Sequence, residues 1–458
     1  MREKVDLLNG PIYKTLVKMS LPLMGTAFIQ MAYSFIDLIW LGKLSTDAVA
    51  AVGTCGFFVW IANSLMLIGK TGVSVGLSQA YGRGNEREAK EVFKASATVN
   101  LIICIVVTTL YLIFKENLVD IFHLDESVKT LAIDYFVIVT IGLIFLFANP
   151  VLHASFLAKG NSFTPFIISI VSLITNIVLD PILIFGIGPF PQMGVKGAAL
   201  ATVLAQAIGF FLTLLAGIRG QEVFVRIKYF SKVSFNYVKG VLKLGVPACA
   251  QSIIHALVSL YLNIYIASYG AAAIAAYSIG SQIESIAWMS SEGFASAFAA
   301  FFGQNYGAKK FDRLKEARKK GIVIICLIGG FATILLFTKA EELFTFFIPI
   351  DKEAIRIGAM YLMVIAPSEL FMTLEIGTTG MMSGLGLTRY PALVGLVFNA
   401  FRIPMAKLLM PIYMVNGIWA AMSLSSILKG IFLLIGYEVY NRKTNGFTEN
   451  MSNYITEN

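Results

Sequence analysis

The residues best placed to do chemistry in this chain are two carboxylates embedded in apolar sequence. Asp37 lies within the apolar stretch 21–41, and Asp180 lies within the stretch 175–181. A charged side chain at membrane depth costs about 2.5–3.5 kcal/mol. It persists where it faces a water-filled cavity, holds a proton or binds a cation. Both carboxylates are therefore predicted to be functional.

The neighbours of Asp180 add further oxygen ligands. Asn176 and Asp180 are four positions apart, so they share one helix face. Pro181 has no N–H, which leaves the carbonyl of Ile177 without its usual partner. With Asp37 these groups form an oxygen-only set, which suits a proton or a hard monovalent cation. The alternative is that Asn176 and Asp180 only tie helices together through hydrogen bonds.

The chemistry predicted for such a pair is ion coupling. Two close carboxylates in a medium of low dielectric constant compete for one proton. Moving one charge across a membrane is worth about 2.3 kcal/mol per 100 mV. A proton or sodium gradient acting on the pair could therefore drive efflux of another solute.

Four other acids within apolar segments are weaker candidates. As carboxylates they could bind a cationic substrate, or they could lie at helix ends or pair with Arg402, Lys407 or Lys429. These tentative substrate-binding residues are Glu284, Glu292, Glu369 and Glu375.

Composition indicates that membrane-spanning helices position these residues. Of 458 residues, 57% are hydrophobic and 14% are charged, whereas a soluble domain carries about 25% charge. Apolar windows long enough to span a bilayer recur along the chain. We expect an all-α integral membrane protein with twelve transmembrane helices: 15–42, 48–78, 95–114, 131–157, 164–187, 195–217, 240–268, 271–301, 321–339, 355–380, 389–412 and 417–440.

The net charge of +9 reflects the orientation of the protein in the membrane and does not indicate a nucleic-acid-binding surface. With both termini on one side, 25 of the 36 Lys and Arg lie at the termini and in the connections of that side, and 7 lie on the other. This asymmetry places both termini in the cytoplasm. No cleavable signal peptide precedes the first apolar run. We expect a multi-pass protein of the cell membrane that contacts lipid and binds no nucleic acid.

The chain repeats itself at an offset of 225 residues, as in Pro22 and Pro247, and later at 223, as in Asn176 and Asn399. Each copy has six spans, so the two should form parallel, pseudo-symmetric bundles, an arrangement typical of transporters. The predicted parts are an N-lobe (1–218), a cytoplasmic linker (219–239), a C-lobe (240–440) and a cytoplasmic tail (441–458).

The two copies differ in charge at the candidate site. Asp37 corresponds to Leu262, and Asp180 corresponds to Ile403. The N-lobe thus carries two buried carboxylates that its twin lacks.

Pro22 is predicted to be a conformational residue. It cannot donate to the carbonyl of Lys18, so the first helix has a weak point about four turns before Asp37. A change in the hydrogen bonds of Asp37 could then bend this helix into the N-lobe cavity. The alternative is a static kink that only aids packing.

These motifs resemble the multidrug and toxic compound extrusion (MATE) family over about residues 10–440. The resemblance rests on Pro22 with Asp37, on the segment 76–82 with Asn85, and on its repeat at 303–307. The segments 176–181 and 197–202 are similar to the DinF-like branch.

The resemblance implies a MATE fold and antiport of cationic or amphipathic drugs against protons or sodium ions, by a monomer without a cofactor or an enzymatic activity. It also implies an N-lobe proton or cation site at Asp37, Asn176, Asp180 and Thr202, joined by Tyr135. If sodium is the coupling ion, the first four would hold it.

Three alternatives stand beside this interpretation. In the NorM branch, acids of the seventh and tenth helices form a C-lobe cation site, but His255 and Met372 stand at the matching positions here. Glu369 and Glu375 are each three residues from Met372, so a displaced acid could still form such a site. A lipid-linked oligosaccharide or lipid flippase of the same wider superfamily would need a groove lined with Arg and Lys, and intramembrane cations are few. A membrane-embedded enzyme would need a metal-ligand cluster or a nucleophile constellation, which the sequence lacks.

Overall fold

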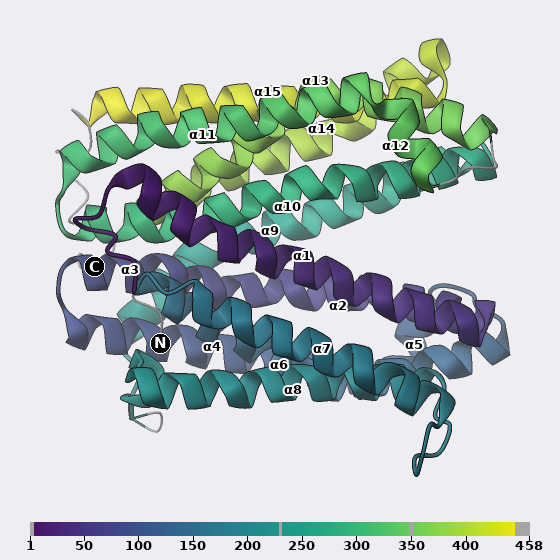
Figure 1. Cartoon of the computed structure of the whole chain (residues 1–458), viewed down its shortest axis with the longest axis horizontal. Coiled ribbons are helices and arrows are strands. Elements are labelled where there is room, and N and C mark those ends of the chain that lie inside the picture. The colour runs from purple at the N-terminus through teal and green to yellow at the C-terminus, as the bar shows by residue number, and fades with distance from the viewer. Residues whose placement is uncertain (1–3, 229–230, 348–351, 445–458) are drawn as a thin grey trace. The chain divides into compact units, whose positions relative to one another are not determined.

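The computed structural model describes residues 4–228, 231–347 and 352–444, and within them it is helical with no strand (Figure 1). This confirms the predicted all-α class. Most of the predicted tail, from residue 445 on, lies outside the described residues. Two long helices belong to both compact units described below: α1 (Ile12–Leu44) and α9 (Phe235–Ala267).

Unit 1 holds Lys4 and Gly25–Cys249, within the described part of the chain. A π-helical turn interrupts its second long helix at Val73–Leu77, and a 3-10 turn follows the last helix at Val223–Val225. Its remaining helices are α2 (Thr46–Gly72), α3 (Ser78–Gly82), α4 (Glu86–Ile113), α5 (Lys115–Asp120), α6 (Glu126–Ala158), α7 (Phe163–Phe185) and α8 (Val195–Gly220).

Unit 2 holds Val5–Met24 and the described residues from Ala250 onward. Its remaining helices are α10 (Ala271–Gly307), α11 (Phe311–Thr338), α12 (Ala340–Phe347), α13 (Lys352–Gly384), α14 (Arg389–Tyr413) and α15 (Val415–Lys443).

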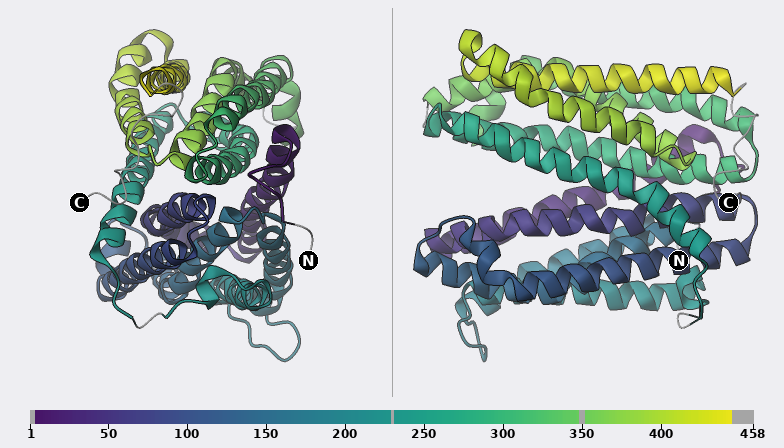
Figure 2. Two further views of the ribbon diagram at one scale, coloured as in Figure 1. Left: turned by 90° about the vertical axis from the view of Figure 1, so that its left-hand side faces the viewer. Right: turned by 180° about the vertical axis from the view of Figure 1, so that it is seen from behind.

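Each unit is a helix bundle built on the same plan (Figure 2). In unit 1, α6 packs against α2, α4 and α8, and α7 packs against α8. In unit 2, α13 packs against α10, α11 and α15, and α14 packs against α15. Small residues let the helices approach at equivalent places: Ala48 and Ala51 are fully buried, as are Ala273 and Ala276. The repeat in the sequence is therefore a repeat in packing.

Eleven helices of the described residues are long and apolar enough to cross a membrane. Helix α10, one of the predicted spans, is not among these eleven, because its middle carries Gln282, Glu284 and several serines. Because α10 is nevertheless one continuous helix of 37 residues, it completes the twelve expected spans.

The predicted starts of several spans are wrong by about one to three turns. The helix expected from 95 begins at Glu86, where the Asn85 side chain accepts from the N–H of Glu88 at 3.0 Å. The helix expected from 321 begins at Phe311. Charged first turns extend these helices beyond the apolar window from which the spans were predicted. The short helices α5 and α12 are also absent from the prediction, since neither is long enough to span a bilayer.

The two long shared helices pass from one unit to the other just after a proline. In α1 the change falls between Met24 and Gly25, two residues after Pro22. In α9 it falls between Cys249 and Ala250, two residues after Pro247. The lobe limits predicted from the sequence, 1–218 and 240–440, stay a prediction, because compactness does not test which segments move together.

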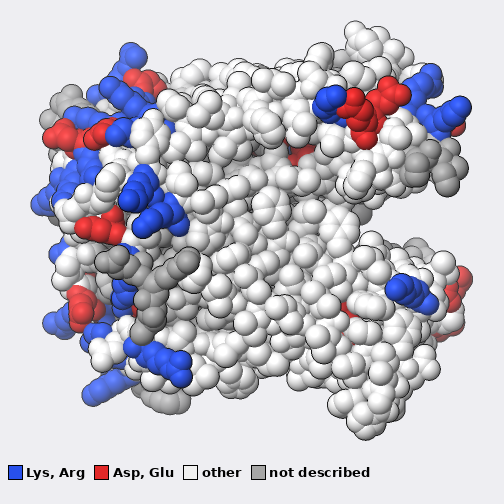
Figure 3. Space-filling view, in the orientation of Figure 1, with Lys and Arg blue, Asp and Glu red and all other residues white. Residues whose placement is uncertain are grey.

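Most of the Lys and Arg visible in Figure 3 lie at one end of the helices, and a smaller group lies at the opposite end. In unit 1 the basic end, where most of them lie, holds the turn between α3 and α4 and the segment after α8. In unit 2 it holds the turn between α10 and α11 and the end of α15. The grouping agrees with the asymmetry counted from the sequence.

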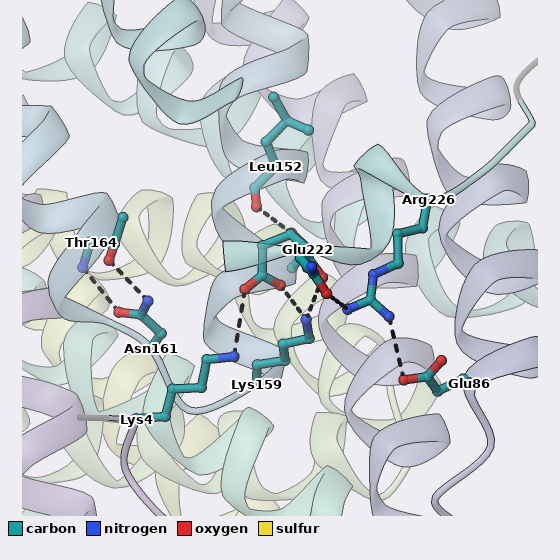
Figure 4. Close-up of polar contacts among 10 residues, drawn as sticks. Lys4, Glu86, Leu152, Lys159, Asn161, Thr164, Glu222 and Arg226 are labelled. Carbon is teal, nitrogen blue, oxygen red and sulfur yellow. Dashed lines mark hydrogen bonds and ion pairs between the residues drawn. The ribbon is translucent and has the colours of Figure 1, made fainter. Parts of the chain in front are cut away.

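A buried ion pair fixes the segment after α8 to this end of unit 1. Glu222 is fully buried, and one carboxylate oxygen lies 2.8 Å from Nζ of Lys159, with Nζ of Lys4 at 3.9 Å from the other (Figure 4). Nearby, Arg226 and Glu86 form an exposed ion pair at 3.6 Å. The buried pair is expected to contribute more to stability than the exposed pair, because breaking it leaves an unpaired charge buried away from water.

We expect Glu222→Ala to lower the melting temperature of the detergent-purified protein by several degrees. Removing one partner of a buried ion pair costs about 3–5 kcal/mol. Glu86→Ala is the matched control, since exposed pairs contribute about 0–1 kcal/mol. Equal melting temperatures for the two variants in a thermal-denaturation assay would show that Glu222 is not a structural anchor.

Candidate ion-coupling site

Helix α7 positions two fully buried polar side chains at the centre of the candidate site. Asn176 and Asp180 are each 0% exposed, and Nδ2 of Asn176 donates to Oδ1 of Asp180 at 3.1 Å. Pro181 lies inside the helix, so the chain supplies no N–H to the carbonyl of Ile177 there. The shared face predicted from the sequence spacing is confirmed.

Helices α1 and α8 bring the other two predicted residues to the same place. The hydroxyl of Thr202 shares its proton between two acceptors. These are Oδ2 of Asp37, at 3.4 Å, and the carbonyl oxygen of Ala198 in the same helix, at 3.1 Å. The close approach of α8 to α7 depends on Gly197, where any Cβ would collide with the backbone of Leu183. The site therefore joins residues 165 positions apart.

The two carboxyl groups face each other. Asp37 and Asp180 lie close enough to interact directly, and Asn176 is near both. One oxygen of each carboxyl, Asp37 Oδ1 and Asp180 Oδ2, is buried with no hydrogen-bond donor, and so is Oδ1 of Asn176. Buried anionic oxygens without donors are strongly unfavourable, so the pair requires a proton or a cation.

The ligand set fits a proton or a monovalent cation. It offers two carboxylates, one amide oxygen and one hydroxyl, all hard oxygen donors. No group of three or more His, Cys, Asp or Glu that could hold a metal ion occurs in the described part of the chain. The donor set thus differs from those of structural zinc or di-metal sites.

Two tyrosines lie within electrostatic range of the carboxylates. Tyr135 of α6, predicted from the resemblance, is 9% exposed and lies within electrostatic range of Asp37 and Asp180. Tyr33 of α1 lies in the same range, beside Ser172 of α7. Tyr33 was missed from the sequence, although its position four residues before Asp37 places it on the same helix face.

The four tentative substrate-binding acids lie on helices α10 and α13 of unit 2. Glu375 forms an ion pair with Lys429 at 2.8 Å, one of the alternatives left open by the sequence. Glu284 accepts from the hydroxyl of Tyr361 at 2.6 Å.

The other two acids differ in burial. Glu369 is 0% exposed, and neither of its carboxyl oxygens has a hydrogen-bond partner among the described residues. Glu292 is partly buried on α10. None of these observations tests substrate binding, so this role stays a prediction.

A family model and several known proteins match this chain. The MatE family model matches residues 22–182 and 247–408, which are the two repeats. The chain is 28% identical to the "Probable multidrug resistance protein YoeA" of Bacillus subtilis, with 77% of each chain covered. It is 26% identical to the "Probable multidrug resistance protein NorM" of Thermotoga maritima, with 93% of each covered.

A solved structure of the same fold is that of a MATE protein in the bent conformation. It superposes with a TM-score of 0.87 at 22% identity and covers 97% of this chain and 99% of the other. The chain belongs to the MatE family, and it is a multi-pass membrane transporter of the MATE fold rather than an enzyme.

Proposed function

We propose that this transporter exports cationic and amphipathic compounds in exchange for protons or sodium ions. The relatives named as multidrug resistance proteins support this substrate class and favour it over the lipid-linked oligosaccharide flippase. In this proposal the protein works as a monomer in the plasma membrane and needs no cofactor beyond the coupling ion.

The observation that carries the proposal is the pair of facing carboxyls, Asp37 and Asp180, with a donor-less oxygen on each. Binding a proton or Na⁺ between them removes the cost of the buried charge. Asn176 and Thr202 hold the carboxyl groups in place through the hydrogen bonds described above, and Tyr135 lies within electrostatic range of both. Since the twin positions Leu262 and Ile403 are apolar, the coupling site belongs to one repeat only.

A bend in α1 is proposed to link ion uptake to release of the exported compound. Neutralising Asp37 changes its contact with Thr202, and α1 responds by bending near Pro22. Helix α1 passes from unit 2 to unit 1 between Met24 and Gly25. This supports a bend at that position, because the segments before and after it pack against different partners.

Separately imposed ion gradients test the proposal. Proteoliposomes containing the wild-type protein should accumulate or release a fluorescent organic cation when a proton or a sodium gradient is applied. A response to one gradient alone identifies the ion. Transport that is the same with and without either gradient would contradict secondary active export.

The proposed orientation places both termini in the cytoplasm. In a variant without native cysteines, Lys319→Cys in the basic start of α11 should resist a membrane-impermeant maleimide in intact cells and react after permeabilisation. Glu341→Cys in α12 should react in intact cells, since it lies at the other end of α11, and both positions are exposed. The opposite pattern would invert the topology.

A further inference from the structure

Three polar side chains of unit 2 meet where α9 and α14 end. The hydroxyl of Tyr265 donates to that of Tyr261 at 3.0 Å, and the two rings pack edge to face with their centroids 4.9 Å apart. Lys407 of α14 lies close enough to interact with both hydroxyls. All three residues lie in the last two turns of their helices, since α9 ends at Ala267 and α14 ends at Tyr413.

This cluster has more hydrogen-bond donors than acceptors. The ammonium group of Lys407 has three N–H donors and no acceptor, and two hydroxyls joined by one hydrogen bond keep one further proton. If Lys407 donates to both hydroxyls, one N–H and one O–H still lack an acceptor among the described residues. Neither helix contains Asp or Glu, and neither do the turns that follow them. The cluster therefore lacks a negative counter-charge from its own helices.

The surface around the cluster is apolar. Helix α14 carries a stripe of exposed apolar side chains along most of its length, and α9 carries a shorter one. Lys407 and Tyr261 are exposed beside these stripes. On a membrane-spanning helix such a stripe indicates contact with lipid. The stripes consist of Leu393, Val397, Phe401, Leu408 and Ile412 on α14 and of Leu257, Leu260 and Ile264 on α9.

The bilayer offers a matching acceptor at this depth. Lysine side chains near the end of a span extend their ammonium groups to the headgroup level, where tyrosines are also enriched. Basic sites between spans bind anionic headgroups. A zwitterionic headgroup brings an ammonium group of its own, whereas an anionic headgroup leaves its phosphate charge to the protein. Charge complementarity at Lys407 therefore favours an anionic lipid.

We propose that Tyr261, Tyr265 and Lys407 bind the phosphate group of an anionic phospholipid at the end of unit 2 opposite its basic end. The phosphate supplies the acceptor and the negative charge that the cluster lacks, and the acyl chains cover the apolar stripes of α9 and α14. The site shares no residue with the ion site of unit 1, and it does not depend on the proposed export function.

A fluorophore beside the site reports which lipid occupies it. In a variant without native cysteines, Leu408→Cys is labelled with a bimane and placed in vesicles of phosphatidylcholine and phosphatidylglycerol, one of which has brominated acyl chains. Quenching should show phosphatidylglycerol enriched about fivefold at position 408, as expected for one lysine at a headgroup. Lys407→Gln should lower this preference to about one, and Tyr265→Phe should lower it in part.

Two controls separate the site from general effects of charge. Lys339→Gln removes a cation from the same end of unit 2, but that cation already pairs with Glu342 at 2.9 Å, so the preference at position 408 should persist. A bimane introduced through Phe331→Cys, on the exposed apolar face of α11, should show no preference for either lipid.

Equal quenching by the two lipids at position 408 would overturn the proposal, as would a preference that survives Lys407→Gln. Absence of quenching by either lipid would show that this surface does not face the bilayer and would overturn it too. Loss of the preference on addition of inorganic phosphate would assign the cluster to free phosphate and overturn the lipid assignment.

Discussion

Replacing Asp37 with Asn is expected to abolish uphill export while leaving the fold intact. The substitution removes the charge that takes up the ion but preserves the volume and a hydrogen-bond acceptor for Thr202. One net charge crossing 100 mV supplies about 2.3 kcal/mol, which sustains a roughly 50-fold concentration ratio of an exported compound that carries no net charge. Without coupling that ratio should fall to about one.

The same result is expected for Asp180→Asn, because both carboxyls take part in binding one ion. The measurement is drug resistance and drug accumulation in cells that express each variant at the wild-type level. Asp47→Asn is the matched control, since Asp47 is exposed in the first turn of α2. Normal resistance in either site variant would refute N-lobe coupling.

The second large effect is expected from Pro22→Ala, which should slow export without weakening drug binding. Alanine restores the N–H that proline lacks, so the helix can close its hydrogen bond to Lys18 and resist bending. Turnover depends on the bend, whereas the binding groups remain in place. The variant should therefore lose transport rate at unchanged affinity.

Initial rates in proteoliposomes, together with equilibrium binding of the same drug, separate these effects. Pro411→Ala is the matched control, because Pro411 also lies inside a helix but is exposed near its end. Undiminished turnover in Pro22→Ala would mean that the proline contributes to packing alone.

The sequence predicted the spans, and it selected Asp37 and Asp180, which the structure brings together. Apolar windows predict spanning helices because a bilayer imposes a minimum length. Helix α10 is the exception: its middle is polar, and its continuous length of 37 residues supports a span there. Asp37 and Asp180 could be selected because a carboxylate is rare and costly in such windows. Spacing alone placed Asn176 beside Asp180.

Pairings between distant helices could not be read from spacing. Thr202 came only from the resemblance, because its contact with Asp37 depends on how α8 packs on α7. For the same reason the sequence left open the partner of Glu375, which proves to be Lys429. Helix ends beyond the apolar window were missed because their charged turns carry no hydrophobic signal. The coincidence of Pro22 and Pro247 with the change of unit emerges only from the packing.

The most direct test of ion coupling at Asp37 and Asp180 is ion counterflow driven by the exported compound. Proteoliposomes with an internal pH indicator, and in parallel with radioactive sodium, are exposed to a gradient of an organic cation with no ion gradient imposed. We expect the wild-type protein to move one of the two ions against the compound. Asp37→Asn and Asp180→Asn should move neither ion, although they still bind the compound. Counterflow at the wild-type rate in the Asp37→Asn/Asp180→Asn double variant would contradict the account.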